Sequence, residues 1–210
     1  WILSRLARFN EEVVREMNDY ELSRASRKFF DFVEDFSNWY IRRSRKRFQK
    51  PNSEKEFLEA QSTLSFVLKE ASKIMAPFIP FLTEEIYQEM KNKDDRESIH
   101  LCDYPMISEF IDENLETKMQ KARDIVNIAL NERNEKRIKV RQPLGLAKIK
   151  DDLEGEFLEI IKEEINVKEI IIDKNIQNEI ELDFELTEEL KEEGAVREII
   201  RNIQQMRKNL

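Results

Sequence analysis

The sequence predicts a mainly α-helical fold, in which a helical bundle over residues 1–142 is followed by a small α/β subdomain over residues 143–210. In the first part, apolar residues recur every three or four positions, which is the spacing of a buried helix face. The chain has only 3 Gly and 5 Pro, so few residues interrupt helices. After Pro143 the apolar residues instead form short β-branched runs, which are typical of strands.

The first two helices are predicted over residues 2–17 and 20–48. Asn18 or Asp19 is expected to cap the second helix, and Pro51 lies just beyond its end. The apolar side chains of the second helix step mostly by three or four residues and are expected to face the core: Leu22, Ala25, Phe29, Phe32, Val33, Phe36 and Tyr40.

Capping residues and prolines mark the next boundaries. Ser53 and Glu56 have the spacing of a capping box, so a third helix is expected to begin there. Residues 76–81 read APFIPF, and their two prolines predict a buried bend. Thr83 is then expected to cap a shorter helix.

An extended connector over residues 98–105 leads to a long helix over residues 112–137. The predicted elements of the subdomain are a strand over 146–149, a helix over 157–165 and strands over 167–173 and 179–186. Thr187 is expected to N-cap a last helix, since two acidic residues follow it in the first turn.

The composition excludes several kinds of site. Cys102 is the only cysteine and His100 the only histidine, so neither an internal disulfide nor a Cys/His zinc site is possible. A lone cysteine fits a reducing cytoplasm. No apolar run approaches the ~18 residues that cross a membrane, and no glycine-rich phosphate loop is present. His100 is therefore expected to be a connector residue, and we predict no catalytic or metal-binding residue in this chain.

Two basic islands interrupt an acidic chain of net charge −8. Residues 38–50 and residues 136–150 each contain six Lys or Arg and no acidic residue. Residues 151–193, by contrast, contain 17 acidic residues and 4 Lys. Because salt screens charges beyond ~8–10 Å, binding follows such local patches rather than the net charge.

The first island, NWYIRRSRKRF, favours an RNA partner. Arg donates two parallel hydrogen bonds to a phosphate, and an aromatic side chain can stack on an unpaired base. Trp39 is either such a platform or a core residue. The alternatives for the island are a solvated face paired with acidic residues of the same protein, or a helical protein-interaction module that binds an acidic partner.

Three segments in order, NWYIRRSRKRF, APFIPFLTEEIYQ and SIHLCDYP, resemble the anticodon-binding domain of the isoleucyl-tRNA synthetases, which are class I enzymes. The last third, which includes RIKVRQPLGLAKI and EINVKEI, looks like the small α/β region of the archaeal and eukaryotic-like branch. The resemblance spans nearly the whole chain. The anticodon-binding domain of valyl-tRNA synthetase, or of another sibling, is the nearest alternative.

The resemblance implies that the chain binds the anticodon stem-loop of tRNA(Ile), for an enzyme that joins isoleucine to tRNA using ATP. The family's ATP-binding signatures, HIGH and KMSKS, are absent here. We therefore expect ATP and Mg²⁺ to be used by a catalytic domain elsewhere in the same chain, and no cofactor in this segment. The absence of an initiator Met also suggests a segment of a longer protein. We expect a cytoplasmic protein with no membrane or DNA partner.

The predicted tRNA-binding residues come from the two islands. They are Trp39, Arg42, Arg43, Arg45, Lys46, Arg47, Arg137, Lys139, Arg141 and Gln142. The sequence does not separate residues that contact phosphates from residues that read bases.

Overall fold

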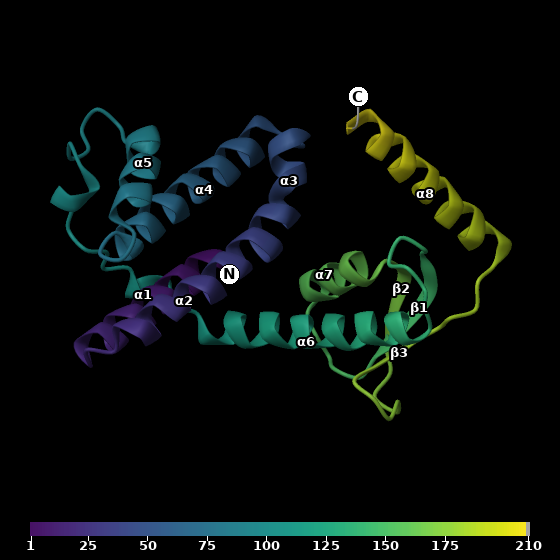
Figure 1. The fold of residues 1–210 in the computed structure, drawn as a ribbon. Coiled ribbons are helices and arrows are strands. Elements are labelled where there is room, and N and C mark those ends of the chain that lie inside the picture. The colour runs from purple at the N-terminus through teal and green to yellow at the C-terminus, as the bar shows by residue number, and fades with distance from the viewer. Residues whose placement is uncertain (209–210) are drawn as a thin grey trace. The chain divides into compact units, whose positions relative to one another are not determined.

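The computed structural model describes residues 1–208, which fall into two compact units (Figure 1). The first unit is Trp1–Glu116, and the second begins at Thr117. Helices dominate and a single small sheet lies in the second unit, so the predicted fold class is confirmed. The domain boundary after residue 142 stays a prediction. Each unit is described separately below.

The first unit consists of helices joined by short turns. In chain order they are α1 (Ile2–Asn18), α2 (Leu22–Glu34), the π-helix η1 (Asp35–Ile41), α3 (Arg42–Gln49), α4 (Glu54–Met75), α5 (Pro80–Met90) and the 3₁₀ turns η2 (Ile99–Leu101) and η3 (Ser108–Phe110). In Figure 1, α1 and α2 run side by side, and α4 lies against α5.

The core of the first unit lies between α1, α2 and α4. Leu6, Phe9 and Val13 of α1 are fully buried, as their helical spacing predicts. The Phe9 ring stacks on that of Phe32 in α2, with 4.6 Å between the ring centroids. Ile74 of α4 belongs to the same cluster. This packing holds α2 against α1, and α3, which carries most of the first basic island, packs against α4.

The second predicted helix begins later than expected. Tyr20 has a left-handed backbone with a φ of 60°, and α2 starts at Leu22 with Glu21 as its N-cap. Neither Asn18 nor Asp19 caps it, so that expectation was wrong. Leu22 and Val33 are exposed rather than buried, at 58% and 46%.

The Ser53 cap of α4 is confirmed, since the backbone N–H of Glu56 donates to Ser53 Oγ at 3.1 Å, but the Glu56 carboxylate accepts from the Asn52 N–H at 2.7 Å, one residue before the position that a full capping box requires. The bend after α4 is also present but only partly buried, because Ala76 is 7% exposed and Phe78 packs against the core, whereas Phe81 is 90% exposed. The Thr83 cap was wrong. Pro80 occupies the first position of α5, which suits a residue without an N–H, and Thr83 lies inside the helix.

The second unit takes in most of α6 and the α/β elements. They are α6 (Glu113–Glu135), β1 (Leu144–Ile149), α7 (Gly155–Ile165), β2 (Val167–Ile172), β3 (Ile180–Leu182) and α8 (Glu188–Lys208). Thr187 caps α8 as predicted, because its Oγ1 accepts a hydrogen bond from the Leu190 N–H at 3.3 Å.

The sheet has the strand order β2-β1-β3. β1 pairs in parallel with β2 and antiparallel with β3, so the central strand is the one that is buried most. The helix α7 forms the crossover between the two parallel strands, as parallel pairing requires. Within residues 1–208, no helix has the length and apolar character needed to cross a bilayer.

Candidate nucleic-acid interface

The first basic island begins within the π-helix η1, which was not predicted from the sequence. α2, η1 and α3 form one unbroken helical path, because the residues at both junctions keep right-handed helical angles. The rings of Phe32, Phe36 and Tyr40 lie nearly parallel along its inner side, with successive centroids 5.9 Å apart. The π-helix therefore lies within a continuous aromatic stack.

The reason for the π-helix lies in the spacing of the inward residues. They recur every four residues at Phe32, Phe36, Tyr40 and Ser44. On an α-helix of 3.6 residues per turn, a step of four overshoots a full turn by roughly 40°, so repeated steps carry a residue from the core to solvent. A π-helix has i→i+5 hydrogen bonds and more residues per turn, which cancels this drift.

A buried ion pair fixes the π-helix to α1. Arg5 Nε donates to Asp35 Oδ2 at 2.8 Å, and Asp35 is buried at the first position of η1. Both side chains are largely shielded from water, so loss of either partner would leave an uncompensated charge in a buried site. The start of the π-helix is thus tied to the core of the unit.

On the solvent-facing side of α2, η1 and α3, a second set of side chains also recurs every four residues. Its members are Phe30, Glu34, Asn38, Arg42 and Lys46, and all five are exposed. The π-helix keeps these residues in phase for the same reason that it keeps the aromatic row buried. We call these five residues the outward row.

The structure separates the predicted contacts of the first island by exposure. Arg42, Arg45 and Lys46 are exposed, whereas Arg43 and Arg47 are partly buried. Arg42 Nε donates to the Asn38 carbonyl at 2.8 Å, which anchors its side chain on the π-helix. Within residues 1–208, Arg45 and Lys46 have no ion-pair partner. These two cations remain available to an external anion.

The other predicted residues of this island lie nearer the protein. Trp39 is partly buried and interacts with other residues, so its ring is less available than a free platform would be. Arg47 Nε lies 3.9 Å from Glu56 Oε1 at the start of α4. The alternative interpretation, a basic face paired with acidic residues of the same protein, therefore applies to Arg47 and not to Arg45 or Lys46.

The second basic island is organised by a residue that the sequence reading missed. Arg133 of α6 is only 1% exposed and has no carboxylate partner within the described residues. Its guanidinium donates to the carbonyls of Lys139, Gln142 and Asn166 at 3.3, 3.0 and 3.1 Å. Burial lowers the pKa of Arg133 to about 10. Arg133 thus holds the loop that carries the predicted contacts.

Arg133 could have been found in the sequence. It follows Val126 and Ala129 at the spacing of the buried face of α6, where a charged residue is unusual. An arginine at a core position indicates a buried hydrogen-bonding role, since a buried polar group needs partners. Its partners, three backbone carbonyls, are not readable from the sequence.

Within the second island, the predicted residues have different surroundings. Arg137 is exposed and has a left-handed backbone with a φ of 57°. Lys139 Nζ and Arg141 Nε lie 3.2 and 2.9 Å from the carboxylate of Glu198 in α8. Gln142 Nε2 donates to the Leu190 carbonyl at 2.6 Å.

Gln142 also fits tightly against α8. A Cβ added at Gly194 would lie 2.1 Å from Gln142 Oε1, so a larger residue there would require the Gln142 side chain to move. The side chain of Gln142 is therefore used to hold α8 against the loop, and Glu198 stands where an anion would bind Lys139 and Arg141.

Glu198 makes the stability of this contact depend on pH. Hydrogen bonds from Lys139 and Arg141 hold the pKa of Glu198 below its ordinary 4.5. A carboxyl group with a lowered pKa stabilises the fold above its unfolded value, and the contribution is lost as the pH falls through the folded value. We expect Glu198→Gln to lower the urea midpoint at pH 7 and to lower it by less as the pH falls toward 3, since protonation of the wild-type carboxylate weakens the same contact. Equal losses at both pH values would contradict this assignment.

Within the described residues, the side chains of Ser98, His100 and Cys102 make no hydrogen bond with one another. Ser98 Oγ accepts a hydrogen bond from the His100 backbone N–H at 3.2 Å, which caps the 3₁₀ turn η2. Cys102 Sγ points instead to Tyr87 Oη at 3.3 Å. No group of three metal-ligating side chains occurs in the part of the chain that the structure describes. The segment 98–105 serves as a connector, as expected, but it is not extended throughout, because residues 99–101 form the 3₁₀ turn η2.

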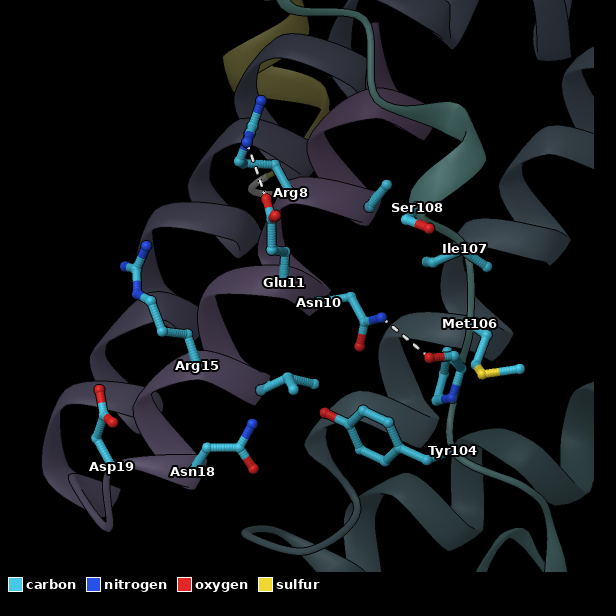
Figure 2. Close-up of a pocket in the computed structure, with 13 residues that line it drawn as sticks. Arg8, Asn10, Glu11, Arg15, Asn18, Asp19, Tyr104, Met106, Ile107 and Ser108 are labelled. Carbon is cyan, nitrogen blue, oxygen red and sulfur yellow. Dashed lines mark hydrogen bonds and ion pairs between the residues drawn. The ribbon is translucent and has the colours of Figure 1, made fainter.

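A groove of about 980 Å³ lies between α1 and residues 104–108 (Figure 2). Asn10 Nδ2 donates to the Pro105 carbonyl at 3.0 Å on its inner side. Arg8 on its rim pairs with Glu11 at 2.8 Å. Because acidic and basic residues both line it, the groove lacks the excess of positive charge that a polyanion needs.

Among known proteins, this chain resembles tRNA ligases. A family model described as the anticodon-binding domain of tRNA ligase matches residues 1–150. Isoleucine–tRNA ligase of Protochlamydia amoebophila (strain UWE25) is 40% identical over 189 residues, or 87% of this chain. The same ligase of Chlamydia trachomatis serovar L2 is 43% identical over 176 residues, or 81%. The chain spans only 18% and 17% of the length of these two relatives.

Proposed function

The chain belongs to the family of anticodon-binding domains of tRNA ligases, and from this we propose that it binds the anticodon stem-loop of tRNA(Ile). In this proposal it positions the tRNA for a catalytic domain of the same chain, which joins isoleucine to the tRNA with ATP and Mg²⁺. We expect the protein to be in the cytoplasm, because translation uses the product of this reaction there. The catalytic step itself uses none of the residues described here.

The exposed cations of α3 are the observation that carries the proposal. Arg42, Arg45 and Lys46 project from one helical segment with no acidic residue between residues 38 and 50. Proteins recognise RNA sequence mainly in unpaired loops, and the surrounding phosphates supply much of the affinity. A cluster of exposed Arg and Lys is suited to those phosphates, because each makes charge-assisted hydrogen bonds.

We propose two roles for the predicted residues. The exposed cations contact the RNA directly, and in the second island a phosphate replaces Glu198 on Lys139 and Arg141. The less exposed residues of the set hold the exposed cations in position. The full set is Trp39, Arg42, Arg43, Arg45, Lys46, Arg47, Arg137, Lys139, Arg141 and Gln142.

Binding measurements over a range of salt concentrations test this function. We expect the 210-residue chain to bind the tRNA(Ile) anticodon stem-loop more tightly than that of tRNA(Val). The logarithm of affinity should fall with the logarithm of salt by about 0.7–0.9 for each phosphate contact. Preference for tRNA(Val) would move the chain to the sibling enzyme. Absence of binding to either RNA at low salt would overturn the proposal and favour an acidic protein partner.

A further inference from the structure

Phe30 is an exposed aromatic residue at the first position of the outward row. It lies in α2 and is 77% exposed, while its neighbour Phe29 packs against Phe9 and Phe78 in the core. No ring contact involves Phe30 within the described residues. Val33, which is 46% exposed, is one turn further along the same side of the helix. A large apolar surface is thus open to solvent beside the basic island.

The outward row changes chemistry along its length. Phe30 offers a ring face, Glu34 a hydrogen-bond acceptor, and Asn38 both an amide donor and an acceptor. Arg42 and Lys46 follow with positive charge. Glu34 would repel a phosphate, but a carboxylate accepts hydrogen bonds from base amino groups. The N-terminal half of the row therefore suits bases, and the C-terminal half suits phosphates.

The length of the row also suits a loop of RNA. From Phe30 to Lys46 the helix axis covers on the order of 20 Å, at a rise of up to ~1.5 Å per residue. That distance corresponds to roughly six nucleotides at ~3.4 Å each. A nucleotide loop lying along the row can thus reach both of its ends.

We propose that Phe30, rather than Trp39, is the platform on which an unstacked base of the bound RNA loop stacks, while Arg42 and Lys46 hold the phosphates that follow. The inference rests on the function proposed above and deepens it. Trp39 is partly buried and already engaged, whereas Phe30 presents most of its surface to solvent. Stacking on an aromatic side chain tolerates any base, because each base has a π-face.

The test compares substitutions of Phe30 in the 210-residue chain, with the tRNA(Ile) anticodon stem-loop as the probe. Phe30→Ala is expected to weaken binding about 5- to 150-fold, which is the measured range for one stacked base. Phe30→Trp should retain the affinity, and Phe30→Leu should not, because leucine is apolar but has no ring. The salt slope should be unchanged in all three variants, because Phe30 carries no charge.

Phe81→Ala is the matched control, since Phe81 is a phenylalanine of the same unit in α5 and is 90% exposed, against 77% for Phe30. It should leave binding unchanged. A stem-loop with 2-aminopurine in the loop gives a second readout, because stacking on the ring should quench its fluorescence with the wild-type chain and not with Phe30→Ala.

The outcomes separate this inference from the proposed function. If Phe30→Ala and Phe30→Leu bind like the wild-type chain while substitution of Arg42 and Lys46 abolishes binding, the platform is wrong and the RNA-binding function stands. If the wild-type chain binds no tRNA stem-loop, both are overturned. If instead Phe30→Ala loses an acidic protein partner and not RNA, the exposed aromatic surface belongs to a protein interface.

Discussion

Changing Arg42, Arg45 and Lys46 together to Glu removes the binding of the chain to the tRNA(Ile) stem-loop. The three side chains are exposed, so the fold should be retained. Each hydrogen bond to a charged group contributes ~1.5–3 kcal/mol, and three of them correspond to a loss on the order of 10³-fold or more. The salt slope should also fall by about 2–3, because three phosphate contacts are gone. Filter binding at several salt concentrations measures both quantities.

A matched control separates local contacts from total charge. Lys55, Lys174 and Lys191 are exposed lysines outside both islands, and their change to Glu alters the net charge by the same amount. That variant should keep most of the affinity and the full salt slope. If it loses binding as severely as the first variant, then the first island is not the site and only the overall charge matters.

Arg133→Ala should have the largest effect on stability. The substitution leaves three backbone carbonyls without the guanidinium that pairs them and opens a cavity in a site that is 1% exposed. An unpaired buried group costs ~1–3 kcal/mol, so we expect a loss of at least ~3 kcal/mol in the free energy of unfolding. Urea denaturation followed by circular dichroism measures this loss.

Two further variants sharpen that measurement. Lys136→Ala alters an exposed residue just beyond the end of the same helix and should change stability by less than ~0.5 kcal/mol. Arg133→Lys keeps the charge but lacks the planar fork, so it should recover only part of the loss. A fully stable Arg133→Ala variant would show that the loop over residues 137–142 does not depend on this arginine.

Much of the fold could be predicted because its elements have strong local signals. α1, α4 and α6 have sustained apolar periodicity, and Ser53 and Thr187 cap helices where their spacing predicts. The errors in burial fall where tertiary packing decides. Val33 and Phe81 are apolar but exposed, since the sequence does not show which apolar faces other elements cover.

The candidate site was predictable in its charge but not in its geometry. The basic residues of α3 are evident in the sequence, but their division into exposed and paired side chains depends on Glu56 and on the π-helix. A signal for the π-helix was nevertheless present. Phe32, Phe36, Tyr40 and Ser44 keep a spacing of four for longer than an α-helix can hold it on one face.

The π-helix also determines where the chain can tolerate a change of length. Across its seven residues the backbone rotates about the helix axis less than an α-helix of the same length would, and the difference is roughly the rotation of one residue. Removing one of these residues, such as the exposed Ser37, therefore lets the segment become α-helical while α3 keeps its orientation. The same deletion within regular α4, for example at Ser62, rotates Val67 and Ile74 away from the core by roughly 100°. Among relatives of this domain, a one-residue gap is therefore expected between residues 35 and 41 and not within α4.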